Sequence, residues 1–201
     1  MDREKRQLRT VQTRFETREE GDGAPHIAGY FAVFGSNYEI APQLSESIAQ
    51  GAFSDSLGGD VRALTNHDTT LVLGRTAAGT LTLREDEHGL WGDIAINPND
   101  GDAMNTYARV ARGDVSQCSI GFEIVDEVPE SRADGSVHWT IKAVDLYEVS
   151  VCTFPAYAET NVQARSREAA ELKRRRLEAW KIRMREVLKN GSQSPDAPEK
   201  A

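Results

Sequence analysis

Three side chains in this chain have the chemical types that a serine hydrolase uses. Ser119 lies in the run 117–122 (QCSIGF), His67 precedes it, and Glu148 follows it. A serine hydroxyl is a weak nucleophile at neutral pH, so it requires a nearby base and a carboxylate that orients that base. If the three side chains converge in the fold, the chain is a protease; if they do not, it is an acidic β-rich domain without this chemistry.

The serine is the weakest signal when it is considered alone, because most serines in strands are ordinary half-buried hydroxyls. Gly121 strengthens the hypothesis, since a glycine there lets the backbone pass close to a substrate carbonyl. Ser116 is the alternative nucleophile. It faces the opposite side of a regular strand from Ser119, so at most one of the two points toward His67.

The base and the carboxylate are chosen from their surroundings. His67 ends the run 63–66 (ALTN), whereas the other histidines are expected to be exposed: His26, His88 and His138. Glu148 lies in the β-like run 145–151, where a carboxylate is costly unless it is paired or faces solvent. Asp145, at the start of that run, is the second choice for the orienting acid. Asp68, next to His67, is expected to cap the following turn instead.

The elements that must position these residues are mostly short strands. Alternating or β-branched runs predict strands at 26–34, 61–66, 71–73, 80–84, 89–96, 115–125, 137–144 and 146–154. A helix is expected from a cap at Asp102 to about Arg112, and Pro129 to Ser136 is expected to be a polar loop. Strands without a βαβ rhythm predict a mainly β (α+β) domain, a small barrel or packed sheets.

Composition divides the chain into four parts. Residues 1–20 are expected to be a flexible arm or an edge strand, 21–162 the β domain, 163–190 a basic amphipathic helix, and 191–201 a disordered tail.

Charge separates the β domain from the helix. Residues 21–162 hold 7 Lys/Arg against 21 Asp/Glu, and residues 163–189 hold 10 Lys/Arg against 4 Glu. An acidic body is a poor binder of nucleic acid. In the helix, Leu177, Trp180, Met184 and Val187 fall at heptad-like spacing. This pattern favours docking on the domain or on a partner helix over a membrane surface or nucleic acid.

The remaining composition predicts no cofactor, no metal and no membrane. Cys118 and Cys152 are the only cysteines, and their spacing supports neither a disulfide framework nor a zinc site, so both are expected to be buried thiols. No signal peptide and no apolar run long enough to span a membrane are recognised, which predicts a soluble cytoplasmic protein.

Taken in order, these motifs resemble the prohead serine proteases (head maturation proteases) of tailed phages over about residues 26–162. The matching segments are Gly29-Tyr30, Phe34-Gly35, Gly51-Ala52-Phe53, Asn66-His67-Asp68, Leu73-Gly74-Arg75, Gly89-Leu90, Ser119-Ile120-Gly121-Phe122, Leu146-Tyr147-Glu148-Val149-Ser150-Val151 and Thr153-Phe154-Pro155-Ala156. The resemblance implies a closed antiparallel β-barrel with flanking helices, similar to herpesvirus assemblin. It also implies that His67 is the general base, Ser119 the nucleophile and Glu148 the orienting acid, where assemblin uses a histidine.

The same resemblance implies a function and its partners. The protease would cleave scaffold, or the scaffolding segment of the major capsid protein, and itself, inside the immature head. The location implied is the host cytoplasm within the assembling prohead, encoded by a phage or by a prophage in a bacterial genome. The alternative is a non-catalytic scaffold or capsid-assembly protein that binds shell protein through its C-terminal helix.

Overall fold

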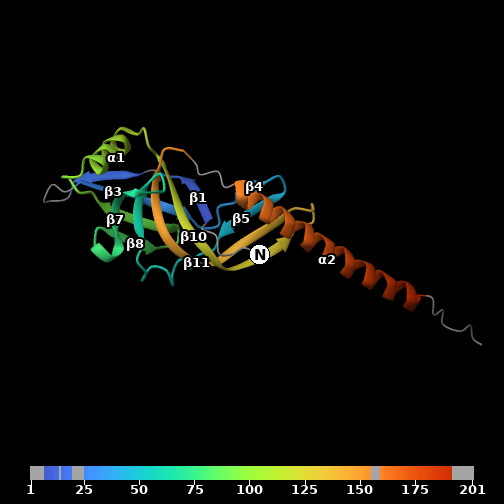
Figure 1. Ribbon diagram of the computed structural model, residues 1–201. Coiled ribbons are helices and arrows are strands. Elements are labelled where there is room, and N and C mark those ends of the chain that lie inside the picture. The colour runs from blue at the N-terminus through green and yellow to red at the C-terminus, as the bar shows by residue number, and fades with distance from the viewer. Residues whose placement is uncertain (1–6, 14, 20–24, 155–158, 192–201) are drawn as a thin grey trace, which may run out of the picture.

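The computed structural model describes residues 7–13, 15–19, 25–154 and 159–191, which form two β-sheets and two α-helices (Figure 1). The helices are α1 (Gly101–Arg112) and α2 (Glu159–Gly191). The strands are β1 (Gln7–Gln12), β2 (Glu16–Glu19), β3 (Pro25–Val33), β4 (Tyr38–Ala41), β5 (Leu44–Ile48), β6 (Arg62–Thr65), β7 (Asp68–Arg75), β8 (Leu81–Glu85), β9 (Gly89–Ala95), β10 (Gln117–Ser131) and β11 (Val137–Cys152).

The two longest strands, β10 and β11, form an antiparallel hairpin at the centre of a seven-stranded sheet. β1 pairs with the free edge of β10. On its other edge β11 pairs in parallel with β5 over 137–141 and then with β6 over 148–151. The sheet is therefore mixed: these two pairings are parallel, whereas the other strand pairings described are antiparallel, as expected. A single long strand has room for two partners on one edge, and both partners run in its own direction.

The second sheet is antiparallel, in the order β2-β3-β9-β8. Its buried side chains and those of the first sheet share one core. The largest fully buried members are Phe31, Phe53, Phe122, Ile27, Ile48, Leu90, Ile94, Ile120 and Ile141. Alternation along each strand produces this arrangement, because every second side chain points to the same face. Among the described strands no backbone pairing joins the two sheets, so the closed barrel remains a prediction.

Three local expectations differ from the structure. Asp100, not Asp102, caps α1, because its carboxylate accepts hydrogen bonds from the backbone N–H groups of Asp102 and Ala103. The two strands expected over 137–154 are one continuous strand. The expected loop 129–136 is shorter, since β10 continues to Ser131. Cross-strand pairing extended these strands beyond what local propensity indicates.

The helix α2 begins against the sheets and then projects away from them (Figure 1). Ala169 is buried and Leu172 partly buried against a small cluster that contains Trp139. Farther along, Leu177, Trp180 and Ile182 are each at least half exposed. The expected boundary after residue 162 falls inside this helix, and the expected tail 192–201 lies outside the described residues.

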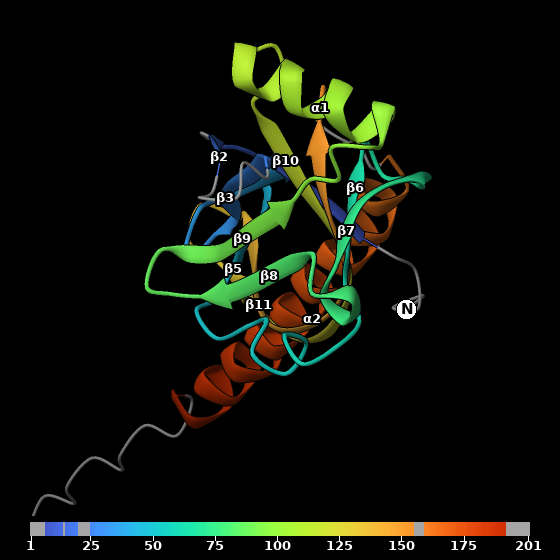
Figure 2. The same ribbon diagram turned by 90° about the vertical axis from the view of Figure 1, so that its left-hand side faces the viewer.

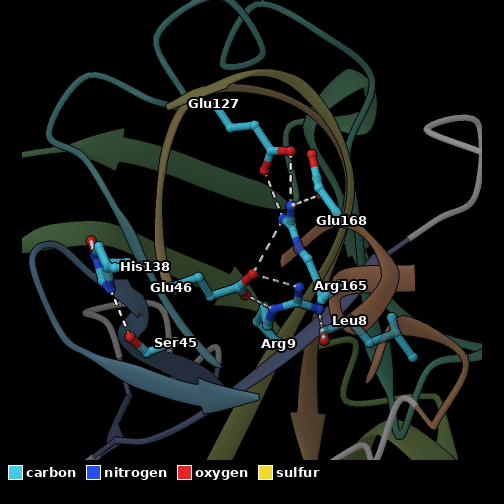
Figure 3. Close-up of polar contacts among 9 residues, drawn as sticks. Leu8, Arg9, Ser45, Glu46, Glu127, His138, Arg165 and Glu168 are labelled. Atoms are coloured by element: carbon cyan, nitrogen blue, oxygen red, sulfur yellow. Dashed lines mark hydrogen bonds and ion pairs between the residues drawn. The ribbon is translucent and has the colours of Figure 1, made fainter. Parts of the chain in front are cut away.

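A buried network of charges joins α2 to three strands (Figure 3). Arg165 donates two hydrogen bonds to the Glu127 carboxylate, at 2.8 and 2.6 Å, and a longer one of 3.5 Å to Glu46. Glu46, which is fully buried in β5, also receives hydrogen bonds from Arg9 of β1. The Arg165 guanidinium lies 4.8 Å from the centre of the Trp139 ring.

The network connects β1 to the start of α2 through one carboxylate. Glu46 accepts from Arg9 near the N-terminus and from Arg165 near the start of α2. Removing one partner from a buried ion pair leaves an uncompensated charge, which costs more than the pair contributes. The first turns of α2 therefore stabilise the sheets even though its later turns lie free of them.

We predict that Arg165→Met lowers the free energy of unfolding by about 3–5 kcal/mol, because Glu127 keeps its burial and loses its bidentate partner. Arg167→Met is the matched control: Arg167 is exposed on the same helix, so its loss should change stability by less than about 0.5 kcal/mol. Urea unfolding of both variants measures the difference. Adding Glu127→Gln to Arg165→Met should restore part of the loss. Equal stabilities of the two single variants would show that the network does not anchor the helix.

Candidate active site

One face of the β10–β11 hairpin carries a group of buried polar side chains. On β11 these are Glu148, Ser150 and Cys152, with exposures of 2%, 0% and 1%, and on β10 it is Ser119, with 0%. Ser119 is directly opposite Ser150 in the antiparallel register, so the two side chains share a face. Buried polar groups are costly unless they are hydrogen-bonded, and they often mark functional sites.

His67 reaches this face from a tight hairpin turn. Asn66 and His67 form the two-residue connection between β6 and β7, and both have positive φ, 52° and 61°. A connection of this kind matches a type I′ turn, which requires positive φ at both central residues. The sequence placed His67 at a strand end, whereas the structure places it in the turn itself. Because β6 pairs in parallel with β11 over 148–151, the turn lies beside the end of β11.

Backbone and side-chain contacts hold this turn against β11. The Asn66 backbone N–H donates to the Val151 carbonyl at 2.9 Å, and the Asn66 side-chain oxygen accepts from the Thr153 N–H at 2.8 Å. The asparagine also suits the left-handed conformation better than most residues.

The imidazole of His67 contacts Glu148 closely. Nδ1 of His67 lies 2.6 Å from Oε1 of Glu148, in a pair whose side chains are 15% and 2% exposed. An ionised carboxylate only accepts hydrogen bonds, so Nδ1 carries the proton, and Nε2 of the neutral ring is left as an acceptor. This is the tautomer that a general base requires.

The second ring nitrogen faces a thiol. Nε2 of His67 lies 3.8 Å from Sγ of Cys152. Burial, together with the negative charge of Glu148, raises the pKa of the Cys152 thiol to about 12. The thiol is therefore neutral at physiological pH, and a neutral buried thiol is a poor nucleophile.

The structure does not show the hydrogen bond that the sequence predicts between Ser119 and His67. Within the described part of the chain, the buried Ser119 Oγ has no hydrogen-bond partner. The structure thus brings His67 and Glu148 into contact and places Ser119 on the neighbouring strand of the same face, with its hydroxyl unsatisfied.

The alternative residues lie outside this group. Asp145 is exposed, and its strand position is opposite Glu123 rather than near the turn. Ser116 is exposed before β10 begins. The Asp68 carboxylate accepts from the backbone and the hydroxyl of Thr70, as expected for a turn cap.

Sequence reasoning missed two residues of the site and misjudged the exposure of two histidines. Ser150 and Cys152 share the face of Glu148 by simple alternation, which was the available signal. The side chain of His26 was expected to be exposed, but it is 13% exposed and its Nδ1 lies 2.9 Å from Oδ1 of Asp93. His138 was expected to be exposed but is buried, with its ring nitrogens 2.8 Å and 2.9 Å from the hydroxyls of Ser45 and Ser47. Desolvation lowers the pKa of His138, which favours a neutral ring between the two hydroxyls.

A cavity of about 250 Å³ lies between β7 and the start of α1, and Thr65, which precedes the Asn66–His67 turn, is part of its wall. Asp100 and Asp102 contribute carboxylates to its lining. In Figure 2, α1 lies across the end of the sheets at which β6 and β7 meet. The Thr65 hydroxyl is 3.2 Å from the hydroxyl of Thr106 in α1.

No group of three or more His, Cys, Asp or Glu side chains that could hold a metal ion occurs within the described ranges. The helices described here also include none with the length and apolarity to cross a membrane.

The His67–Glu148 contact and a buried serine on the same face of the hairpin are side chains of the types that a serine peptidase uses. A model of the family described as caudovirus prohead serine protease matches residues 12–175, and the chain belongs to this family. The match extends beyond both ends of the segment over which the sequence motifs indicated the resemblance.

Individual phage proteases also resemble the chain. The prohead protease of Enterobacteria phage HK97 is 30% identical over 154 residues, which are 74% of this chain and 64% of that protein. The chain thus covers somewhat less than two thirds of the length of this relative. The structure of the bacteriophage T4 capsid assembly protease aligns with a TM-score of 0.50 at 11% identity, over 74% of this chain and 97% of that one. At this identity the likeness concerns the fold.

We predict that the thiol beside His67 reacts slowly with iodoacetamide in the folded protein. With a pKa of about 12, Cys152 should react roughly a thousandfold slower at pH 8 than an exposed cysteine, and its rate should rise about tenfold per pH unit up to pH 10, since the thiolate is the reactive form. Mass spectrometry of the alkylated protein measures this rate, and the urea-unfolded chain is the control. Rapid alkylation of Cys152 in the folded protein would instead indicate a reactive cysteine.

Proposed function

We propose that this protein is a serine endopeptidase of phage head maturation. The observation that carries the proposal is the 2.6 Å contact between His67 Nδ1 and Glu148 Oε1, on the same face of the hairpin as Ser119. Membership in the prohead serine protease family supports it. In this proposal Ser119 is the nucleophile, His67 the general base and Glu148 the orienting acid.

The proposed reaction has two halves. Ser119 Oγ attacks the scissile carbonyl while Nε2 of His67 accepts its proton, and the leaving amine then takes that proton from His67. Water, activated by His67, hydrolyses the acyl-enzyme. The buried Glu148 carboxylate stabilises the imidazolium formed in each half. Backbone N–H groups near Ser119 supply the oxyanion hole, a contribution of about 3–4 kcal/mol per donor in related chemistry.

The proposed reaction requires a change from the described arrangement. Nε2 of His67 now faces Cys152, and Ser119 Oγ is fully buried. Catalysis requires the imidazole to turn from the thiol toward Ser119, and it requires the site face to open to a peptide. The described arrangement fits a resting state that substrate binding converts.

The proposed substrates are scaffold protein or the scaffolding segment of the major capsid protein, and the protease chain itself. Cleavage takes place inside the assembling head in the host cytoplasm. The exposed apolar side chains of α2 favour a second candidate function, in which the helix binds shell protein and the chain acts as a scaffold without catalysis.

We predict that co-expression with the major capsid protein produces trimmed capsid protein, and that Ser119→Ala abolishes the trimming. The reason is that no other described serine on the site face has a hydroxyl free of hydrogen bonds. Gel electrophoresis and mass spectrometry of the capsid protein measure it. Trimming that persists in Ser119→Ala would remove Ser119 as nucleophile. If neither the wild-type protein nor the variant trims the capsid protein, the result would favour the scaffold function.

The two carboxylates of β11 provide a matched test of the orienting acid. Glu148→Gln should lower the rate of cleavage by about 10²–10⁴-fold with the fold intact, because the amide no longer holds the correct tautomer or stabilises the imidazolium. Asp145→Asn, an exposed acid three positions away, should leave the rate within about twofold. Cleavage rates and circular dichroism of both variants measure this. The opposite ranking of the two variants would assign the role to Asp145.

A further inference from the structure

Ser150 contacts both the base and the acid of the proposed triad. Its hydroxyl donates to Oε2 of Glu148 at 2.5 Å, and its Oγ accepts the backbone N–H of His67 at 3.2 Å. Since Oε1 of Glu148 binds the His67 ring, the three residues form a closed circuit of hydrogen bonds. Ser150 is fully buried, so water does not replace either bond.

The hydrogen bond to the His67 backbone holds a residue whose backbone conformation is unfavourable. His67 has a φ of 61°, a region that a residue with a side chain rarely adopts and that the surroundings must hold in place. The imidazole is attached to the backbone through Cβ. A hydrogen bond that fixes the His67 N–H therefore also fixes the point from which the ring extends.

The bond to Glu148 acts on the acid. Burial of an ionised carboxylate at 2% exposure requires hydrogen-bond donors, and the Ser150 hydroxyl supplies one to the oxygen that does not face the imidazole. The donor fixes the plane of the carboxylate, and this leaves Oε1 directed at Nδ1.

The same contacts make Ser150 unsuited to be the nucleophile. Its single proton is already donated to Glu148, and its oxygen meets the backbone of His67 rather than the ring. Ser119, directly opposite on β10, has a hydroxyl without a partner among the described residues. Two serines on one face therefore have different roles.

We propose that Ser150 is a positioning residue that aligns Glu148 and His67 for proton transfer from Ser119. The inference rests on the proposed function and adds to it a fourth side chain that does not touch the substrate. Its effect is on the rate of the chemical step and on the protonation of the His67–Glu148 pair. The Cys152 thiol and the Ser119 hydroxyl lie on the same face, as do Gln117, opposite Cys152, and Thr10, opposite Ser119.

The test uses the full chain and a fluorophosphonate probe, which labels activated serines covalently. Ser150→Ala should slow labelling of Ser119 by about 10- to 100-fold, as expected for the loss of a hydrogen bond to a charged group. The acidic limb of its rate–pH profile should move to higher pH, because the Glu148 carboxylate loses a donor and the His67–Glu148 pair therefore holds its proton more strongly.

Ser150→Thr and Ser150→Val are the matched pair, since they have nearly the same shape and differ in the hydroxyl. Ser150→Thr should label within about threefold of the wild type, and Ser150→Val should be as slow as Ser150→Ala. This pair decides the question even if the alanine variant folds poorly, because both variants introduce the same bulk. Capsid-protein trimming should follow the same order.

The outcomes separate the two proposals. A wild-type protein that is not labelled at Ser119 would overturn the proposed function and the positioning role with it. Normal labelling of the wild type together with equal rates for Ser150→Thr and Ser150→Val would overturn the positioning role alone. An unchanged pH profile in a slow Ser150→Ala variant would assign Ser150 a merely structural role.

Discussion

The site is organised by the burial of one carboxylate. Glu148 lies in the middle of a strand that is buried on both faces, at 2% exposure, where a charged group is unfavourable unless hydrogen-bonded partners surround it. Two of those partners are the imidazole of His67 and the hydroxyl of Ser150. The parallel pairing of β6 with β11 and the tight turn at Asn66–His67 are what bring the imidazole within reach. The local architecture thus follows from satisfying this charge.

Two further buried carboxylates stabilise the fold in a similar way, one on β10 and one on the neighbouring strand β5. Glu46 and Glu127 are neutralised by Arg9 and Arg165, which come from β1 and α2. β1 is also the strand that pairs with β10, where Thr10 lies opposite Ser119. The strand that carries Ser119 is in this way connected to the attachment of α2.

The strands expected from alternation correspond closely to those of the structure around the core, since alternation directly reports which side chains are buried. Expectations were less accurate wherever tertiary pairing extended or joined elements. β11 is one strand because two successive partners, β5 and β6, support it along one edge, and no local sequence signal reports a partner that is distant in the chain. His138 was misjudged for the same reason: Ser45 and Ser47, which satisfy it, lie more than 90 residues away.

The sequence by itself determined the kinds of residue available, their order and the family, because these depend on side-chain type and on short motifs that persist in the unfolded chain. It predicted His67, Ser119 and Glu148 as site residues, with Ser119 chosen as the serine on the apolar strand. Only the tertiary structure decided which groups touch. The His67–Glu148 contact spans 81 residues and depends on strand register, in which a shift of one position would turn every side chain to the other face. The same register placed Ser150 in contact with both residues and left the Ser119 hydroxyl without a hydrogen-bond partner among the described residues, and no local pattern encodes that arrangement.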